Sequence, residues 1–280
     1  MILGIDIGGS TTKIVAFGED GLLKATLQVK ASDQITSLYG AVGHLLCKNG
    51  MTLGQISGII LTGVGAAFAD DDIYGIPTFR VREFEAIGCG GLLLSGLKKA
   101  LVVSMGTGTA FVRATEGGYV HVGGSGVGGG TLLGLSSKLL KEEDAGVVSE
   151  LAKHGDPGNV DLLIHDISRA DIPSLPSSAT AANFGHIKPS ATRADLAAGL
   201  INMVFQTAGI MAAFACMNTD LHKVVVTGSL ATLPQAQEIL SSVGDLYGLK
   251  FIIPENAIFA TAIGAAELHF HRGQVSPEEG

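Results

Sequence analysis

The chain has 280 residues, of which 46% are hydrophobic and 16% are charged. This composition excludes an intrinsically disordered chain and indicates a globular protein of one large or two medium domains. A formal net charge of −8, with 18 Lys and Arg residues and no basic run, argues against a nucleic-acid-binding protein.

Cysteine usage and hydropathy bear on where the protein works. Cys47, Cys89 and Cys216 are far apart and form no CxxC pair, which is typical of free, buried thiols in a reducing compartment. Asp6 interrupts the apolar N-terminal stretch, so no signal peptide is expected. Residues 200–217 are the one candidate membrane span, but their polar side chains favour a buried helix. We therefore expect a soluble, cytoplasmic protein.

The N-terminal region is predicted to begin with three strands. They cover residues 1–7, 12–18 and 22–29, and a GEDG segment between the second and third supplies hairpin turn chemistry. Apolar residues then recur at helical spacing over residues 32–49, with Ser32 as the candidate N-cap.

Three segments of the chain share one pattern, an apolar strand followed by a loop of glycine and hydroxyl residues. They are residues 1–13, 99–110 and 223–229. Ligands of open α/β sheets bind at the carboxyl ends of the strands, so these loops are expected to face one cleft between two similar lobes. We place the lobes at residues 1–115 and 116–280.

The first loop, DIGGSTTK, has the composition of a phosphate and metal site. It offers two glycines for close approach of the backbone to a phosphate, three hydroxyl groups and one ammonium group. These residues are Gly8, Gly9, Ser10, Thr11, Thr12 and Lys13. Asp6 ends the strand and is placed to hold Mg²⁺, partly through water, because Mg²⁺ loses its hydration reluctantly. A hairpin turn with solvated hydroxyls is the alternative for this loop alone.

A second loop, SMGTGTA, repeats the alternation of glycine and threonine after a buried strand. Its candidate phosphate-binding residues are Gly106, Thr107, Gly108 and Thr109. A third glycine cluster, with Gly128 and Gly129, opens an apolar helix whose first N–H groups are expected to face an anion. No Walker A pattern is present, and the G-x-G-x-x-G match at residues 124–129 follows no βα crossover, so a Rossmann site is rejected.

Eight segments occur in the order and spacing of the bacterial type II pantothenate kinases. They are GIDIGGSTTKIV, ILTGVGA, VREFEA, MGTGT, VGGSGVGGGTLLGL, KHGDPGNVDLLIHDI, TAANFGH and NAIFATAIGA. The chain resembles that family over almost its whole length, and with it the superfamily of acetate and sugar kinases, heat-shock ATPases and actin. The resemblance implies a two-lobed, actin-like α/β fold of the ribonuclease H type, with a nucleotide in the interlobe cleft.

The resemblance also implies an activity and its cofactors. The expected reaction is ATP-dependent phosphorylation of pantothenate to 4′-phosphopantothenate, the first step of coenzyme A biosynthesis, with Mg²⁺ as the metal. Asp6 would hold the Mg²⁺ of MgATP. The phosphates would lie against the two loops, at Gly8, Gly9, Ser10, Thr11, Lys13, Gly106, Thr107, Gly108 and Thr109, and the adenosine beside Gly228 and Ser229. A homodimer is expected, with the apolar helix at about residues 191–217 as its candidate interface.

Glu83, in VREFEA, stands where the family keeps its catalytic base. A carboxylate between the apolar residues Val81 and Phe84 also suits a proton acceptor for an attacking alcohol. Glu85 is the rival, because a residue two positions on points the same way in a strand but elsewhere in a helix. Two solvated glutamates at a loop are the remaining alternative.

One departure from the family puts the substrate in question. His121 stands where the family has an arginine that recognises the carboxylate of pantothenate, and a neutral imidazole cannot make that bidentate contact. Substrate contacts are expected from Thr107, His121, Gly123 and Asn183. Arg113 is the candidate replacement cation, and Arg80 and Arg82, beside Glu83 in the chain, are others. The alternatives are pantothenate held by another cation, an uncharged relative such as pantetheine, or a lost kinase activity.

Two functions of other classes compete. Activator ATPases of 2-hydroxyacyl-CoA dehydratases begin with a similar pattern, G-x-D-x-G-S-T-x-x-K, but they need cysteines for an iron–sulfur cluster, and Cys89 has no second ligand at suitable spacing. A nucleotide-binding regulator without phosphoryl transfer is the other. The presence of both Asp6 and Glu83 argues against such a regulator.

Overall fold

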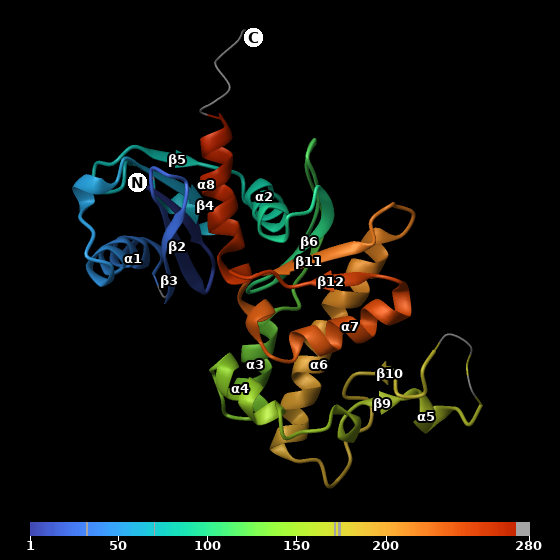
Figure 1. Cartoon of the computed structure of the whole chain (residues 1–280). Coiled ribbons are helices and arrows are strands. Elements are labelled where there is room, and N and C mark those ends of the chain that lie inside the picture. Colours follow the sequence, from blue (N-terminus) through green and yellow to red (C-terminus); the bar gives the residue numbers. More distant parts are fainter. Residues whose placement is uncertain (32, 70, 171, 173–174, 273–280) are drawn as a thin grey trace.

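The computed structural model describes residues 1–31, 33–69, 71–170, 172 and 175–272 (Figure 1). Its first five-stranded sheet has the order β3-β2-β1-β4-β5. The strands are β1 (Ile2–Ile7), β2 (Thr11–Phe17), β3 (Leu23–Lys30), β4 (Gly58–Thr62) and β5 (Thr78–Arg80). The three predicted N-terminal strands are confirmed, and β4 pairs with β1 in parallel.

The second sheet repeats the first. Its order is β12-β11-β6-β7-β8, so in both sheets a central strand has an antiparallel meander on one side and two parallel strands on the other. The strands are β6 (Lys99–Met105), β7 (Thr109–Thr115), β8 (Gly118–Ser125), β11 (Lys223–Thr227) and β12 (Lys250–Ile252). The repeated strand-and-loop pattern therefore reflects two lobes of like topology.

The pairing of the second sheet bears on where the two lobes divide. Strands β6 and β7 precede residue 116, yet they pair with β8, which follows it, in one sheet. Because a lobe needs its sheet intact to close a core, we propose a division between Ser95 and Lys99 in place of the one at residues 115 and 116.

Two helices exchange lobes. Helix α2 (Glu83–Ser95) follows the first sheet but packs on the second, where Ile87 and Leu92 contact Val102 and Val112. Helix α8 (Ala260–Arg272) follows the second sheet but packs on the first, in a cluster with strand β2. The two helices lie side by side between the sheets (Figure 1).

Glycines make the contact between α2 and α8 possible. A Cβ at Gly90 would lie 1.9 Å from the carbonyl oxygen of Ala260, and one at Gly264 would lie 2.1 Å from that of Ala86. The backbones therefore touch directly, which only residues without a side chain allow. This crossing joins the lobes through the core.

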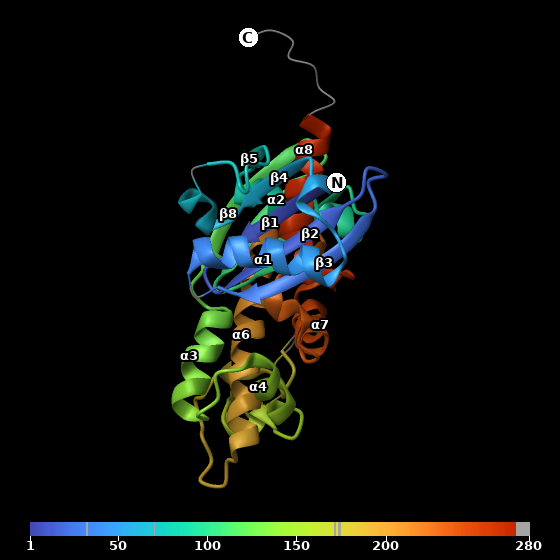
Figure 2. The same cartoon turned by 90° about the vertical axis from the view of Figure 1, so that its left-hand side faces the viewer.

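Helix α1 (Gln34–Lys48) covers the outer face of the first sheet (Figure 2). The predicted cap Ser32 lies outside the described residues, and the N-cap is Asp33, whose carboxylate accepts a hydrogen bond from the N–H of Thr36 at 2.7 Å. A helix cap at this position satisfies a backbone donor that the first turn leaves free.

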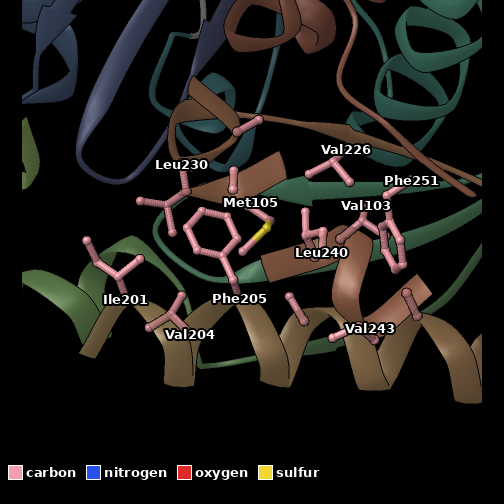
Figure 3. Close-up of a cluster of buried hydrophobic side chains, with 14 of the residues drawn as sticks. Val103, Met105, Ile201, Val204, Phe205, Val226, Leu230, Leu240, Val243 and Phe251 are labelled. Carbon is pink, nitrogen blue, oxygen red and sulfur yellow. The ribbon is translucent and has the colours of Figure 1, made fainter. Parts of the chain in front are cut away.

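The outer face of the second sheet carries the largest core. Phe205 of α6 (Arg193–Cys216) packs among Met105 of the sheet, Leu230 and α7 (Ala236–Tyr247), as Figure 3 shows. The other elements on this side are α3 (Gly129–Leu139), α4 (Ala145–Ala152), β9 (Leu162–Leu163), α5 (Ile164–Ile167) and β10 (Thr180–Ala182). Short 3-10 helices lie at Leu53–Gln55, Val64–Phe68, Pro157–Asn159, Ser229–Thr232 and Ala257–Phe259.

Helix α6 lies mostly in the core of the structure. It is long and apolar enough to span a membrane, yet 67% of its most apolar window is buried inside the structure. That burial also makes most of α6 unsuitable as a dimer interface, contrary to expectation, and leaves Phe214 (58% exposed) at its C-terminal end. The three cysteines are free as predicted, but Cys47 is exposed rather than buried.

Candidate active site

A row of buried polar side chains crosses the first sheet at the end of β1. Asp6 pairs with Lys13 of β2 on one side and with Thr62 of β4 on the other. Side chains alternate along a strand, and Val15 and Ile60 pack toward α8 and α2, so all three polar groups face that side. Asp6 and Lys13 are each 6% exposed, and Lys13 Nζ lies 3.4 Å from Asp6 Oδ2.

Glu83, the first residue of α2, joins this row. Burial and the nearby carboxylate of Asp6 raise the pKa of the half-buried Glu83, and the ammonium of Lys13 opposes the shift. Glu85 instead points to Arg82, with 3.6 Å between its Oε1 and the guanidinium Nη1. The helix thus turns the two glutamates apart, and only Glu83 is held beside Asp6.

The two candidate phosphate loops touch each other. Ser10 Oγ, after β1, lies 2.9 Å from Thr107 Oγ1, after β6, within hydrogen-bond distance. These residues are 97 positions apart in the chain, and the strands that they follow belong to different sheets. The expectation that loops from both lobes meet at one place is met by this pair.

Two threonines of these loops have side chains that are not free to bind a phosphate. Thr12 is buried on the α1 side, because it alternates with Lys13 and pairs in register with Ile7. The hydroxyl of Thr109 donates to the carbonyl oxygen of Val127 at 2.8 Å, which holds β7 to the third glycine cluster. Thr12 is therefore no phosphate donor, and Thr109 supports the second loop through its hydroxyl.

The third glycine cluster also supports the second loop. The N–H of Gly129 donates to the carbonyl oxygen of Gly106 at 2.8 Å, and that of Gly130 to the carbonyl oxygen of Thr107 at 2.9 Å. A Cβ at Gly128 would lie 2.8 Å from the same Thr107 oxygen. The expectation that these first N–H groups of α3 are free to face an anion is therefore wrong, since the loop itself accepts them.

Two glycines occupy equivalent positions after β4 and β11. Gly228, after β11, has φ 92° and would place a Cβ 2.5 Å from the carbonyl oxygen of Met105. Gly63, after β4, has φ 90° and would place a Cβ 2.6 Å from Asp6 Oδ1. Sequence reasoning singled out Gly228 but not Gly63, although the repeated Thr-Gly at residues 62–63 and 227–228 was a visible signal. Ser229 begins the 3-10 helix after Gly228.

His121 lies against Phe84, the residue that follows Glu83. Its ring stacks on Phe84, with 3.7 Å between the ring centroids and 6° between the planes. Phe84 directly follows Glu83 in α2, and His121 comes from β8, two residues before Gly123. The structure thus places His121 against the residue that is next to the expected base in the chain.

Arg113 and Asn183 are not brought to this place. Arg113 lies on the α6 side of its strand, where its charge acts on the thiol of Cys216. Asn183 donates from Nδ2 to Asp161 Oδ2 at 3.3 Å, and the same oxygen accepts a hydrogen bond from Asn202 of α6. The alternation of side chains along β7 explains the direction of Arg113. Asn183 belongs to a buried polar cluster beside β9 and β10.

Two surface cavities lie away from the row of polar residues. One, of about 420 Å³, is lined by residues around Met1 and Asp20, and the other, of about 700 Å³, by residues around Leu175 and Asp245. Neither is lined by a predicted site residue, and the chemistry remains at the meeting point of the lobes.

The residues present fit a Mg²⁺-bound nucleotide. Mg²⁺ in nucleotide sites is commonly held by one or two carboxylates together with phosphates and waters, and Asp6 would supply one carboxylate. Thr62 and Thr227 end equivalent strands, and their buried hydroxyls have no hydrogen-bond partner within the described part of the chain. Within that part no group of three His, Cys, Asp or Glu residues could hold a metal by itself.

Comparison with known proteins agrees with this fold and family. The model of the family described as Fumble matches residues 99–252, which is more than half of the chain. The type II pantothenate kinase of Staphylococcus aureus strain USA300 is 29% identical over 278 residues, which cover 96% of this chain and 99% of that protein.

Solved structures show the same architecture. The activator of the 2-hydroxyisocaproyl-CoA dehydratase from Clostridium difficile, with bound ADPNP, aligns over 100% of this chain and 99% of that chain, with a TM-score of 0.69 and 15% identity. A ROK family glucokinase from Streptomyces griseus, in complex with glucose and AMPPNP, aligns over 95% and 98%, with a TM-score of 0.61 and 13% identity. At these identities the likeness shows the fold alone, the two-lobed actin-like ATPase fold. The chain belongs to the Fumble family.

Proposed function

We propose that the protein is an ATP-dependent kinase that phosphorylates pantothenate to 4′-phosphopantothenate. The observation that carries this proposal is the placement of Glu83, half-buried beside Asp6 and Lys13, at the end of the strand that leads into the first loop. Membership of the Fumble family and the likeness to type II pantothenate kinases support it.

MgATP, when bound, supplies the γ-phosphoryl group and a cation that neutralises its charge. Asp6 would hold the Mg²⁺, and Lys13 would turn to the phosphates. The two loops would bind the phosphates mainly through backbone, with hydroxyls from Ser10, Thr11 and Thr107. Gly128 and Gly129 would hold the second loop in place, and Gly228 with Ser229 would border the adenosine.

Glu83 would accept the proton of the primary alcohol of the substrate as its oxygen attacks the γ-phosphorus. A new O–P bond forms, the bond to the leaving ADP breaks, and the proton moves to the Glu83 carboxylate. A general base works best when its pKa lies near the working pH, and a raised pKa moves a glutamate in that direction.

Pantetheine is the second candidate substrate, favoured by the stacking of His121 on Phe84. That ring offers a flat surface where a guanidinium would bind a carboxylate, and Arg113 faces the other side of the sheet. For pantothenate, we propose Arg82, whose side chain is 87% exposed at the start of α2, as the replacement cation.

An iron–sulfur activator is the less favoured class. Burial raises the pKa of the Cys89 thiol to about 11, which is typical of an inert structural thiol. The thiol is buried against Tyr119 rather than exposed for sharing between subunits.

We place the kinase in the cytoplasm and propose a homodimer.

The test is ATP consumption by the purified protein with pantothenate and pantetheine in parallel. Glu83→Gln is expected to lower kcat by about 10²–10⁴ because the alcohol loses its proton acceptor. Glu85→Gln is the matched control and is expected to retain kcat within a few-fold. No turnover on either alcohol, or full turnover by Glu83→Gln, would contradict the proposal.

A further inference from the structure

The hydroxyl of Thr62 is unexplained by the resting structure. The side chain is 0% exposed, and its Oγ1 has no hydrogen-bond partner among the described residues. A buried hydroxyl is normally paired, since an unpaired one loses its hydrogen bonds to water and gains none in return. A hydroxyl kept in this position therefore points to a partner in another state of the protein.

The partner within reach is Asp6. Thr62 and Asp6 are in register on neighbouring parallel strands and face the same side of the sheet. Gly63, the next residue, runs so close that a Cβ on it would lie 2.6 Å from Asp6 Oδ1. The other oxygen, Oδ2, lies 3.4 Å from Lys13 Nζ. The two oxygens of Asp6 therefore face β4 and β2 respectively.

The arrangement matters when Lys13 moves. An ammonium group that turns toward a bound polyphosphate weakens its contact with Asp6, and a buried carboxylate without a donor is strongly unfavourable. Thr62 is buried in the same row and has an unused O–H donor.

We propose that Thr62 is a positioning residue for Asp6. Its hydroxyl donates a hydrogen bond to Asp6 Oδ1 when Lys13 turns to an anion, and so keeps the carboxylate in place beside Glu83. The proposal rests on the proposed function only for the identity of that anion, the phosphates of a nucleotide.

A double-mutant cycle on the ligand-free protein tests this without any activity. Thr62→Val, nearly isosteric, is expected to leave the melting temperature at or above that of the wild type. In a Lys13→Met background, where Asp6 already depends on Thr62, the same change should lower the melting temperature by at least about 3 °C. Thr62→Ser, which keeps the hydroxyl, should restore most of that loss. An equal effect of Thr62→Val in both backgrounds would overturn the proposal.

Thr12→Val is the matched control. Thr12 is buried in the same sheet and also lacks a partner among the described residues, but it faces α1 instead of Asp6. Its substitution should have the same effect with and without Lys13→Met. If Lys13→Met does not fold, Lys13→Gln takes its place, and if neither folds the binding experiment below decides.

Binding of Mg²⁺-ADPNP, measured by calorimetry, is the second readout. Thr62→Val should raise the Kd for Mg²⁺-ADPNP by about tenfold, and Thr12→Val should leave that Kd unchanged. If the wild type binds and Thr62→Val binds equally well, the proposal is wrong while the kinase function stands. If the wild type does not bind, the proposed function fails, and the double-mutant cycle alone decides the role of Thr62.

Discussion

At the scale of single residues, the direction of a side chain decides its chemistry. Glu83 and Glu85 are two positions apart in one helix. Burial and the nearby Asp6 raise the pKa of Glu83, whereas Glu85 contacts Arg82. His121 and Arg113 lie on neighbouring strands, yet only His121 reaches Phe84. Sequence proximity alone could not separate these pairs.

The raised pKa of Glu83 predicts how activity depends on pH. A base must be ionised, so kcat falls as the pH drops through its pKa. Because burial and Asp6 raise that pKa above the ordinary value of 4.5, the acid limb of the kcat profile should lie above pH 4.5. The limb should be absent from the residual activity of Glu83→Gln. An acid limb at or below pH 4.5 would show that another group sets it.

The stacked pair of His121 and Phe84 predicts a change in selectivity. His121→Arg should raise the ratio of kcat/KM for pantothenate to that for pantetheine by about tenfold, because a guanidinium adds a charge-assisted hydrogen bond to the carboxylate. His121→Gln, which adds no charge, is the control and should leave the ratio nearly unchanged. Unaltered selectivity in His121→Arg would show that another residue binds the carboxylate.

At the scale of elements, the exchange of helices between the lobes places the base. Helix α2 leaves the first sheet beside Asp6 and then packs on the second, so its first residue lies where the lobes meet. Its contact with α8 depends on Gly90 and Gly264, which let the two backbones touch. The glycines of this crossing are therefore structural rather than ligand-binding.

A glycine substitution at the crossing tests its importance. Gly90→Ala should lower the free energy of unfolding by about 3 kcal/mol, because the added Cβ would lie 1.9 Å from the Ala260 carbonyl oxygen. Gly43→Ala in α1 is the control, since its Cβ would meet nothing within 4 Å. That change should raise the free energy by about 0.5–1 kcal/mol through helix propensity. Denaturant unfolding measures both, and similar values for the two would contradict the close crossing.

At the scale of the whole molecule, the two lobes meet through their loops as well as through α2 and α8. The hydrogen bond between Ser10 and Thr107 joins the loops across the lobes, and Gly63 and Gly228 hold equivalent turns on either side. A ligand bound by both lobes should therefore stabilise the molecule as a unit.

Ligand-induced stabilisation tests that view. Mg²⁺-ADPNP at 100 times its Kd should stabilise the wild type by about 2.7 kcal/mol, seen as a rise in melting temperature. Asp6→Asn should lose most of this rise, because the carboxylate proposed to hold Mg²⁺ is gone. Glu85→Gln, which lies outside the nucleotide site, should retain it. An undiminished rise in Asp6→Asn would remove Asp6 from the metal site.

The sequence by itself determined the family, the two-lobed plan and the loops that meet, because each rests on local residue types in a fixed order. The tertiary structure decided what depends on pairing and direction. The N–H groups of Gly129 and Gly130 donate hydrogen bonds to the second loop. Arg113 faces α6, and Thr12 faces α1. The tertiary structure also placed Thr62 beside Asp6. Strand register and helix rotation join residues far apart in the chain, and no local pattern encodes them.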